Sequence, residues 1–174
     1  MRRIAAVALL GALIVAGCGA DPDEKPDAPE PTVIASGFRS GDCNGVSDAD
    51  VTEAVGMKMF TKVVDADAGC FWQEDALTGM GTFGAGMGIS TWWYRGSDMN
   101  TERELEEQAG RTLTELSVDG NNGFKAADDN ACSIYVAKGG DVITWSIQTM
   151  NPATLPDLCS ITEQLAQLSQ ERVN

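Results

Sequence analysis

The sequence predicts an α+β domain in which three helices pack on a mostly antiparallel sheet and two disulfides join the elements. Three observations predict this class. Residues 131–150 alternate between apolar and polar side chains, residues 158–168 carry apolar side chains at helical spacing, and residues 41–174 contain four cysteines. The predicted order is helix, strands, helix, strands, helix, which is typical of an α+β domain with its helices on one face of the sheet.

Residues 131–150 form the clearest element, a β-hairpin. Two alternating runs are separated by Gly139-Gly140, a pair that suits a tight turn. Because successive side chains of a strand point to opposite faces, one face of this hairpin is apolar. That face consists of Cys132, Ile134, Val136, Ile143, Trp145 and Ile147.

The four domain cysteines are predicted to form two disulfides. Cys159 begins a helix with an apolar stripe that we expect to pack on the hairpin, so Cys159 comes near Cys132. That stripe consists of Leu158, Ile161, Leu165 and Leu168. Both Cys43–Cys70 and Cys132–Cys159 are separations of 27 residues, and we favour these two among the three possible pairings. The sequence has no Cys-x-x-Cys pair of the kind that structural zinc sites use, so no metal site is expected.

Two elements follow from local signals. Ser47, with Asp50 three residues later, predicts the start of a helix through a capping box. Gly88–Ser97 is predicted to be a strand in which Trp93 shares a face with Thr91 and Arg95. Trp92 and Tyr94 then share the other face.

Thr101–Leu116 is predicted to be an amphipathic helix. Its buried stripe is expected to contain Leu105, Ala109, Thr112 or Leu113, and Leu116. Its solvated face is expected to contain Glu102, Glu104, Glu106 and Glu107.

The amino-terminal segment has the layout of a secretory signal peptide, with a basic start and an apolar run too short to span a membrane. Val15-Ala16-Gly17-Cys18 is similar to the lipobox of bacterial lipoproteins, in which the signal is cut before a cysteine that carries acyl chains. Residues 1–17 are therefore predicted to be the signal peptide. Cys18 is predicted to be the lipidated residue, modified by diacylglycerol and palmitate, because stable anchoring needs more than one chain.

Residues 18–40 are predicted to be a disordered tether, since they are rich in proline and acidic residues. Residues 41–174 then form a single α+β domain. Without residues 1–17 the chain has 10 basic and 26 acidic residues, a formal charge of −16. Such a chain is not expected to bind nucleic acid through charge. The sequence has no histidine, which excludes the Ser-His-Asp and Cys-His types of catalytic site.

Two groups of residues suggest cofactor sites but are better interpreted as loops. Gly79–Gly84 matches Gly-x-Gly-x-x-Gly, yet a strand rather than a helix is predicted behind it, so no dinucleotide is expected. Asp119–Gly123 and Asp128–Asn130 suit turns better than a calcium loop, because the EF-hand register breaks at Gly123. No cofactor is expected.

A contact surface is predicted around one strand and the loop before it. An aromatic side chain that points away from the core can bind a ligand, and methionines form adaptable apolar surfaces. The candidates are Trp92, Trp93, Tyr94 and Arg95 on the strand, with Met80, Phe83 and Met87 before it.

Several of these stretches together resemble the actinobacterial lipoproteins of the LprB/LprC type, which carry a domain of unknown function. They are CNGVSDADVTEAVG, GCFW, WYRGS, VDGNNGF and the last cysteine opening the final helix. The resemblance covers residues 41–172 and implies a lipid-anchored protein on the extracytoplasmic face of the cell membrane or at the cell surface. It implies no catalytic residue.

We therefore expect a non-enzymatic envelope module, anchored through Cys18, that binds an envelope lipid, a glycan or a partner protein. The alternative is a hydrolase of cell-wall glycans or lipids that uses two carboxylates. That alternative requires a deep pocket with two inward acids about 5–10 Å apart.

Overall fold

The computed structural model describes residues 42–56, 60–75, 86–150 and 157–172. The predicted signal peptide, Cys18, the tether, Met80 and Phe83 lie outside these residues. Among the helices of the described part, none has the length and apolar character that crossing a membrane requires.

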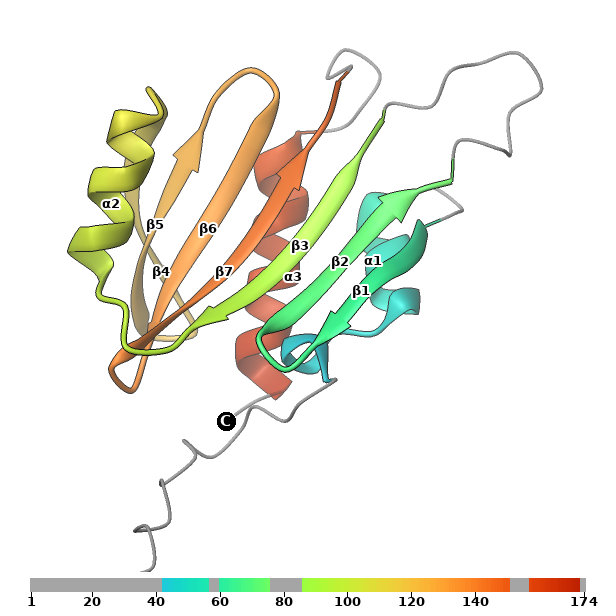
Figure 1. Cartoon of the computed structure of the whole chain (residues 1–174), viewed down its shortest axis with the longest axis horizontal. Coiled ribbons are helices and arrows are strands. Elements are labelled where there is room, and N and C mark those ends of the chain that lie inside the picture. The colour runs from blue at the N-terminus through green and yellow to red at the C-terminus, as the bar shows by residue number, and fades with distance from the viewer. Residues whose placement is uncertain (1–41, 57–59, 76–85, 151–156, 173–174) are drawn as a thin grey trace, which may run out of the picture. The chain divides into compact units, whose positions relative to one another are not determined.

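The described residues build one seven-stranded antiparallel sheet, with the strand order β1-β2-β3-β7-β6-β5-β4 (Figure 1). The strands are β1 (Phe60–Ala66), β2 (Gly69–Glu74), β3 (Gly88–Tyr94), β4 (Thr112–Val118), β5 (Asn121–Ala127), β6 (Ala131–Lys138) and β7 (Asp141–Gln148). The helices are the 3-10 turn η1 (Cys43–Gly45), α1 (Asp48–Val55), α2 (Met99–Gln108) and α3 (Leu158–Arg172). The predicted fold class, with a mostly antiparallel sheet and three α-helices, is confirmed.

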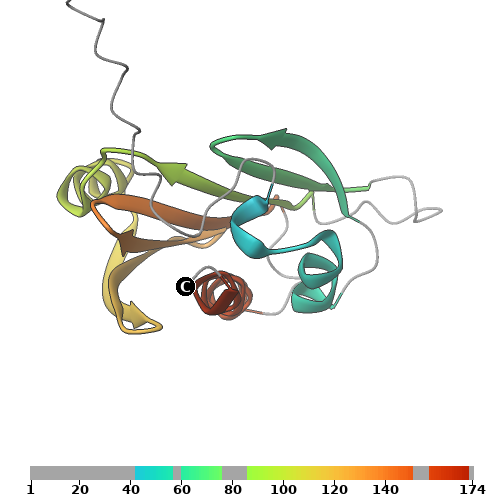
Figure 2. The ribbon, with the colours of Figure 1, turned by 90° about the horizontal axis from the view of Figure 1, so that it is seen from below.

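The helices lie on both faces of the sheet, so the expectation that they share one face was wrong. Helices α1 and α3 cover one face, and α2 lies on the other (Figure 2). The physical reason is visible in β5 and β6, where Phe124, Ala126 and Tyr135 form a second small apolar cluster behind the main core. Helix α2 covers that cluster through Met99.

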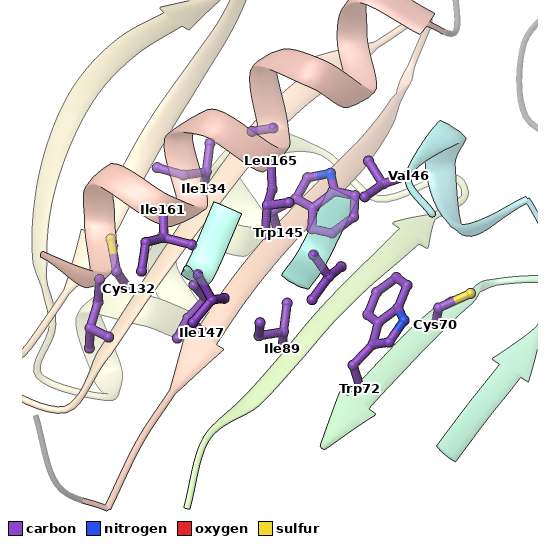
Figure 3. Close-up of a cluster of buried hydrophobic side chains, with 14 of the residues drawn as sticks. Val46, Cys70, Trp72, Ile89, Cys132, Ile134, Trp145, Ile147, Ile161 and Leu165 are labelled. Carbon is purple, nitrogen blue, oxygen red and sulfur yellow. The ribbon is translucent and has the colours of Figure 1, made fainter. Parts of the chain in front are cut away.

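The main core lies between the sheet and the α1/α3 layer. Trp72 of β2 and Trp145 of β7 are fully buried and stack with ring centroids 6.1 Å apart (Figure 3). Ile161 and Leu165 of α3 pack on the same cluster, as the helical stripe predicted. Burying two tryptophans and a row of isoleucines in this layer stabilises the fold, because it removes their apolar surface from water.

Both predicted disulfides are confirmed. Cys43–Cys70 joins η1 to β2, and Cys132–Cys159 joins β6 to α3. Each closes a separation of 27 residues. Both bridges lie in the main core, where they fasten the helical layer to the sheet.

The capping box of α1 is also confirmed. The Ser47 backbone N–H donates to Asp50, and the Asp50 N–H donates to the Ser47 hydroxyl. Arg172, at the end of α3, donates to both oxygens of Asp50 at 2.6 and 3.0 Å. This bidentate pair holds the pKa of Asp50 well below its usual range and joins the first helix to the last.

The predicted helix over Thr101–Leu116 was wrong in its second half. Helix α2 ends at Gln108, Gly110 has a φ of +81°, and Thr112–Val118 is the edge strand β4. Glycine at a left-handed position just after a helix is a common stop signal. In a strand, residues three positions apart point to opposite faces. Leu116 therefore packs against the main core, and Leu113 packs against the cluster under α2.

Candidate functional site

The register of β3 decides which of its aromatic side chains face the core. Thr91 pairs with Trp145 and Trp93 pairs with Ile143, so Trp93 and Thr91 share the face that carries the main core. Trp92 and Tyr94 therefore point to the opposite face. The predicted division of this strand between its two faces is confirmed.

Trp93 and Arg95 form a unit that is separate from Trp92. Trp93 is 5% exposed, and its Nε1–H donates to Asp141 at 2.8 Å. The guanidinium of Arg95 lies over the Trp93 ring, 4.3 Å from its centroid. The four strand residues proposed as one contact surface are thus split between two faces, and only Trp92 and Tyr94 lie on the face away from α3.

No described helix covers the part of that face that lies on β1, β2 and β3 (Figure 1). We call it the open face and define it by the alternate positions that the register places opposite the main core. It consists of Thr61, Val64 and Ala66 on β1, of alternate residues in Gly69–Gln73 and Gly88–Tyr94, and of Ser146 and Gln148 on β7, where Val142 and Thr144 are buried.

Apolar and aromatic side chains stand on the open face. Val64 is 38% exposed and Tyr94 is 37% exposed, while Phe71 and Trp92 are half-buried. Val64 lies directly opposite Phe71 in the pairing of β1 with β2. Around them are hydroxyl and amide side chains, including Ser90, Ser146 and Gln73.

Glycines let the aromatic rings lie close to the sheet. A Cβ added to Gly88 would come within 2.8 Å of the Phe71 ring, so Phe71 covers this glycine. Gly69 pairs with Trp92 in the same register. The Phe71 ring therefore lies close to the sheet, because Gly88 has no side chain at that point.

A buried polar network borders the open face beneath α2. Glu106 accepts a short hydrogen bond from the Tyr135 hydroxyl and pairs with Arg111 at 3.2 Å. Arg111 also donates to Ser133 at 2.9 Å, and Ser133 is hydrogen-bonded to Ser146 at the open face. The expectation that Glu102 and Glu106 lie on a solvated face was wrong, because each is only 8% exposed.

Two tyrosines at the edge of the open face have a raised pKa. Burial raises the pKa of Tyr135, and its hydrogen bond with Glu106 raises that pKa further. Burial also raises the pKa of Tyr94, with a contribution from the negative charges of Glu102 and Glu106. Glu102 accepts a hydrogen bond from Ser97 at 2.5 Å. These glutamates have structural partners and hold the strands to α2.

Three cavities lined by described residues bear on the hydrolase alternative, and two of them have a pair of acids in the lining: Asp128 with Asp129, and Asp42 with Asp48. The largest of three, about 550 Å³, is lined by residues that include Arg111, Asp128, Asn130 and Gln148. Neither Glu102 nor Glu106 lines any of these three cavities. Asp128 accepts from the Asn130 N–H at 2.7 Å, which is the turn chemistry that the sequence predicts there.

The two remaining predictions concern the loop before β3 and metal ligands. Met87 is 1% exposed and belongs to the main core, so its side chain is not at the surface. Among the described residues, Cys43, Asp65 and Cys70 form one group with metal-ligating atoms. The two sulfurs of this group are joined in a disulfide and offer no thiolate.

A comparison of sequences places the chain in a family. The family DUF3558, described as a protein of unknown function, matches residues 13–172 of the chain. The chain belongs to the DUF3558 family. Its relatives include proteins named LprB, provisionally described as lipoproteins, in three mycobacteria, and the predicted resemblance to LprB-type lipoproteins is therefore confirmed.

The degree of similarity differs among these relatives. The Mycobacterium tuberculosis protein is 34% identical over 184 residues, which cover 97% of this chain and 95% of that protein. The Mycobacterium bovis protein is 33% identical with the same coverage. The Mycobacterium leprae protein is 28% identical and matches 73% of this chain and 67% of its own length. No solved structure matches.

Sequence reasoning missed Phe71, Val64 and the glutamate–tyrosine network of this DUF3558 domain. Phe71 precedes the buried Trp72, so it had to face the other side of the sheet, and that alternation was an available signal. The burial of Glu102 and Glu106 had no such signal. Their partners Tyr135 and Arg111 come from other elements, and only the packing of α2 brings them together.

Proposed function

We propose that this chain is a lipid-anchored, non-enzymatic binding module of the cell envelope that contacts its partner through the open face. The observation that carries the proposal is a sheet face that no described element covers and on which Val64, Phe71, Trp92 and Tyr94 are at least partly accessible. Clustered apolar side chains at a surface are typical of interaction sites. Aromatic residues contribute most of the binding energy in many such sites.

The anchor in this proposal is Cys18. The names of the mycobacterial relatives support it, as does the run Val15-Ala16-Gly17-Cys18 at the end of the apolar segment. Acyl chains on Cys18 would hold the chain to the membrane, and export through the signal peptide places the domain on the extracytoplasmic side. Mass measurement of the chain purified from its own cells tests the anchor, and an unmodified Cys18 would contradict it.

Photo-cross-linking in the full acylated chain tests the open face. Gln73 on the open face and Gln164 on α3 are both exposed glutamines, so they form a matched pair of positions for a benzophenone amino acid. We expect a covalent adduct in intact cells from position 73 and not from position 164. Trp92→Ala should remove most of that adduct, and Leu105→Ala, at an exposed residue of α2, should not.

Equal adducts from both glutamine positions would contradict the proposal, as would an adduct at position 73 that does not depend on Trp92.

A further inference from the structure

We infer that the occupant of the open face is an uncharged glycan. This inference rests on the proposed binding role and names the chemistry of the ligand. It is drawn from the charge and the functional groups of the open face, and from the cavity at one end of it.

The open face has no charged side chain at any of its described positions on β1, β2, β3 and β7. The whole chain has a formal charge of −14, so this face differs from the rest of the molecule. A ligand whose ionic group was covered here would lose water without gaining a counter-ion, which is costly. The open face therefore favours a ligand that is neutral where it makes contact.

The functional groups of the open face favour a sugar over an acyl chain. Hydroxyl and amide groups, such as those of Ser90, Ser146 and Gln73, stand among the aromatic rings and can both donate and accept hydrogen bonds. A hydrocarbon surface would remove water from the Ser90 hydroxyl and the Gln73 amide without offering them a partner, at a cost for each one. A neutral sugar offers C–H surfaces to the rings of Trp92 and Tyr94 and hydroxyls to the polar groups.

One end of the open face continues into a polar cavity. Gln148, the last open-face residue of β7, also lines the 550 Å³ cavity, together with Arg111, Asn130 and the carboxylates of Asp128 and Asp129. The amides of Gln148 and Asn130 and the Asp129 carboxylate can hydrogen-bond the hydroxyls of a sugar, while the Arg111 guanidinium is paired with Glu106 and Asp128. A ligand of several sugar units can extend from the aromatic side chains of the open face into this cavity.

The indole signals of the full acylated chain, labelled with ¹⁵N in detergent micelles, test the inference. The probes are neutral hexasaccharides of glucose, mannose, galactose and arabinose, an anionic oligogalacturonate, and vesicles of phosphatidylcholine. Trp72 and Trp145 lie in the main core and report any general change of the fold. We expect at least one neutral hexasaccharide to shift the Trp92 signal saturably and to leave the signals of Trp72 and Trp145 unmoved.

Variants then locate the contact. Trp92→Ala should lower the association constant at least about tenfold, which corresponds to about 1.4 kcal/mol. Leu105→Ala should leave the constant unchanged, since that side chain is exposed on α2.

The possible failures are distinguishable. If no neutral saccharide moves the Trp92 signal while the adduct at position 73 persists, the glycan is wrong and the binding role stands. If only vesicles, or only the anionic oligomer, move that signal, the glycan is also wrong. If the saccharides are silent and no adduct forms, the inference and the proposed function both fail.

Discussion

On the face that packs against α1 and α3, Trp72 and Trp145 stack in a layer fastened by two disulfides. On the opposite face, α2 covers one part through a network of Glu106, Tyr135 and Arg111, and no element among the described residues covers the part on β1, β2 and β3. The first face obtains its stability from apolar burial and covalent links. The opposite face keeps aromatic side chains at the surface, where they contribute less to the stability of the fold.

Strand β3 contributes to both faces: one set of its side chains stabilises the core, and the other set stands on the open face. Along β3, Ile89, Thr91 and Trp93 are buried, while Ser90 and Trp92 are half-buried and Tyr94 is exposed. Alternation alone gives this division, because the period of a strand is two residues. A substitution on one face should therefore change stability, and a substitution on the other should change binding.

The largest effect is expected from the two tryptophans that face opposite ways. Trp72→Ala should lower the free energy of unfolding by about 3–5 kcal/mol, because it removes a fully buried ring that stacks on Trp145. Trp92→Ala should lower it by about 1 kcal/mol or less. Urea unfolding of both variants measures the difference, and equal losses would show that the open face is part of the core.

The disulfides sharpen the comparison within the core face. Removing either bridge by paired Cys→Ala substitutions should cost about 3–4 kcal/mol in the chain-entropy model, because each closes a loop of 27 residues. The two losses should be similar, since the loop lengths are equal. Urea unfolding of the two double variants tests this, and a large inequality would mean that folded-state packing, not loop closure, dominates one bridge.

The smallest effect concerns the network under α2. The raised pKa of Tyr135 means that the folded chain keeps this proton at a pH where the unfolded chain, with a tyrosine pKa of about 10, has lost it. The stabilisation is therefore fully present below about pH 10 and is lost as the pH rises above it, by up to about 1.4 kcal/mol per pH unit.

Tyr135→Phe should reduce this alkaline loss, although the variant is less stable at neutral pH because Glu106 loses a hydrogen bond. Unfolding measured from about pH 8 to about pH 11 gives the two slopes. Tyr94→Phe is the control, since Tyr94 is more exposed and should contribute less. Identical slopes in the wild type and the Tyr135→Phe variant would contradict the assignment.

Local patterns were sufficient for the core-facing half of the fold. The hairpin over residues 131–150, the stripe of α3, the capping box of α1 and both disulfides could be predicted, because each depends on alternation, helical spacing or short-range signals. The second half of the predicted 101–116 helix failed, because TLTEL fits both a helix stripe and a strand. The TLTEL segment becomes a strand with one leucine packed on each face because it pairs with β5, a contact that the local sequence does not indicate.

The sequence by itself determined that Cys132 and Cys159 can meet and that Trp92 and Trp93 must face opposite ways, since these follow from the fixed periods of strand and helix. Only the tertiary structure decided that α2 lies on the far side of the sheet. It also decided that Glu102 and Glu106 are buried there and that, within the described part of the chain, no element covers the uncharged face of the neighbouring strands. The reason is that burial depends on which elements come to lie over a side chain, and those elements are distant in sequence.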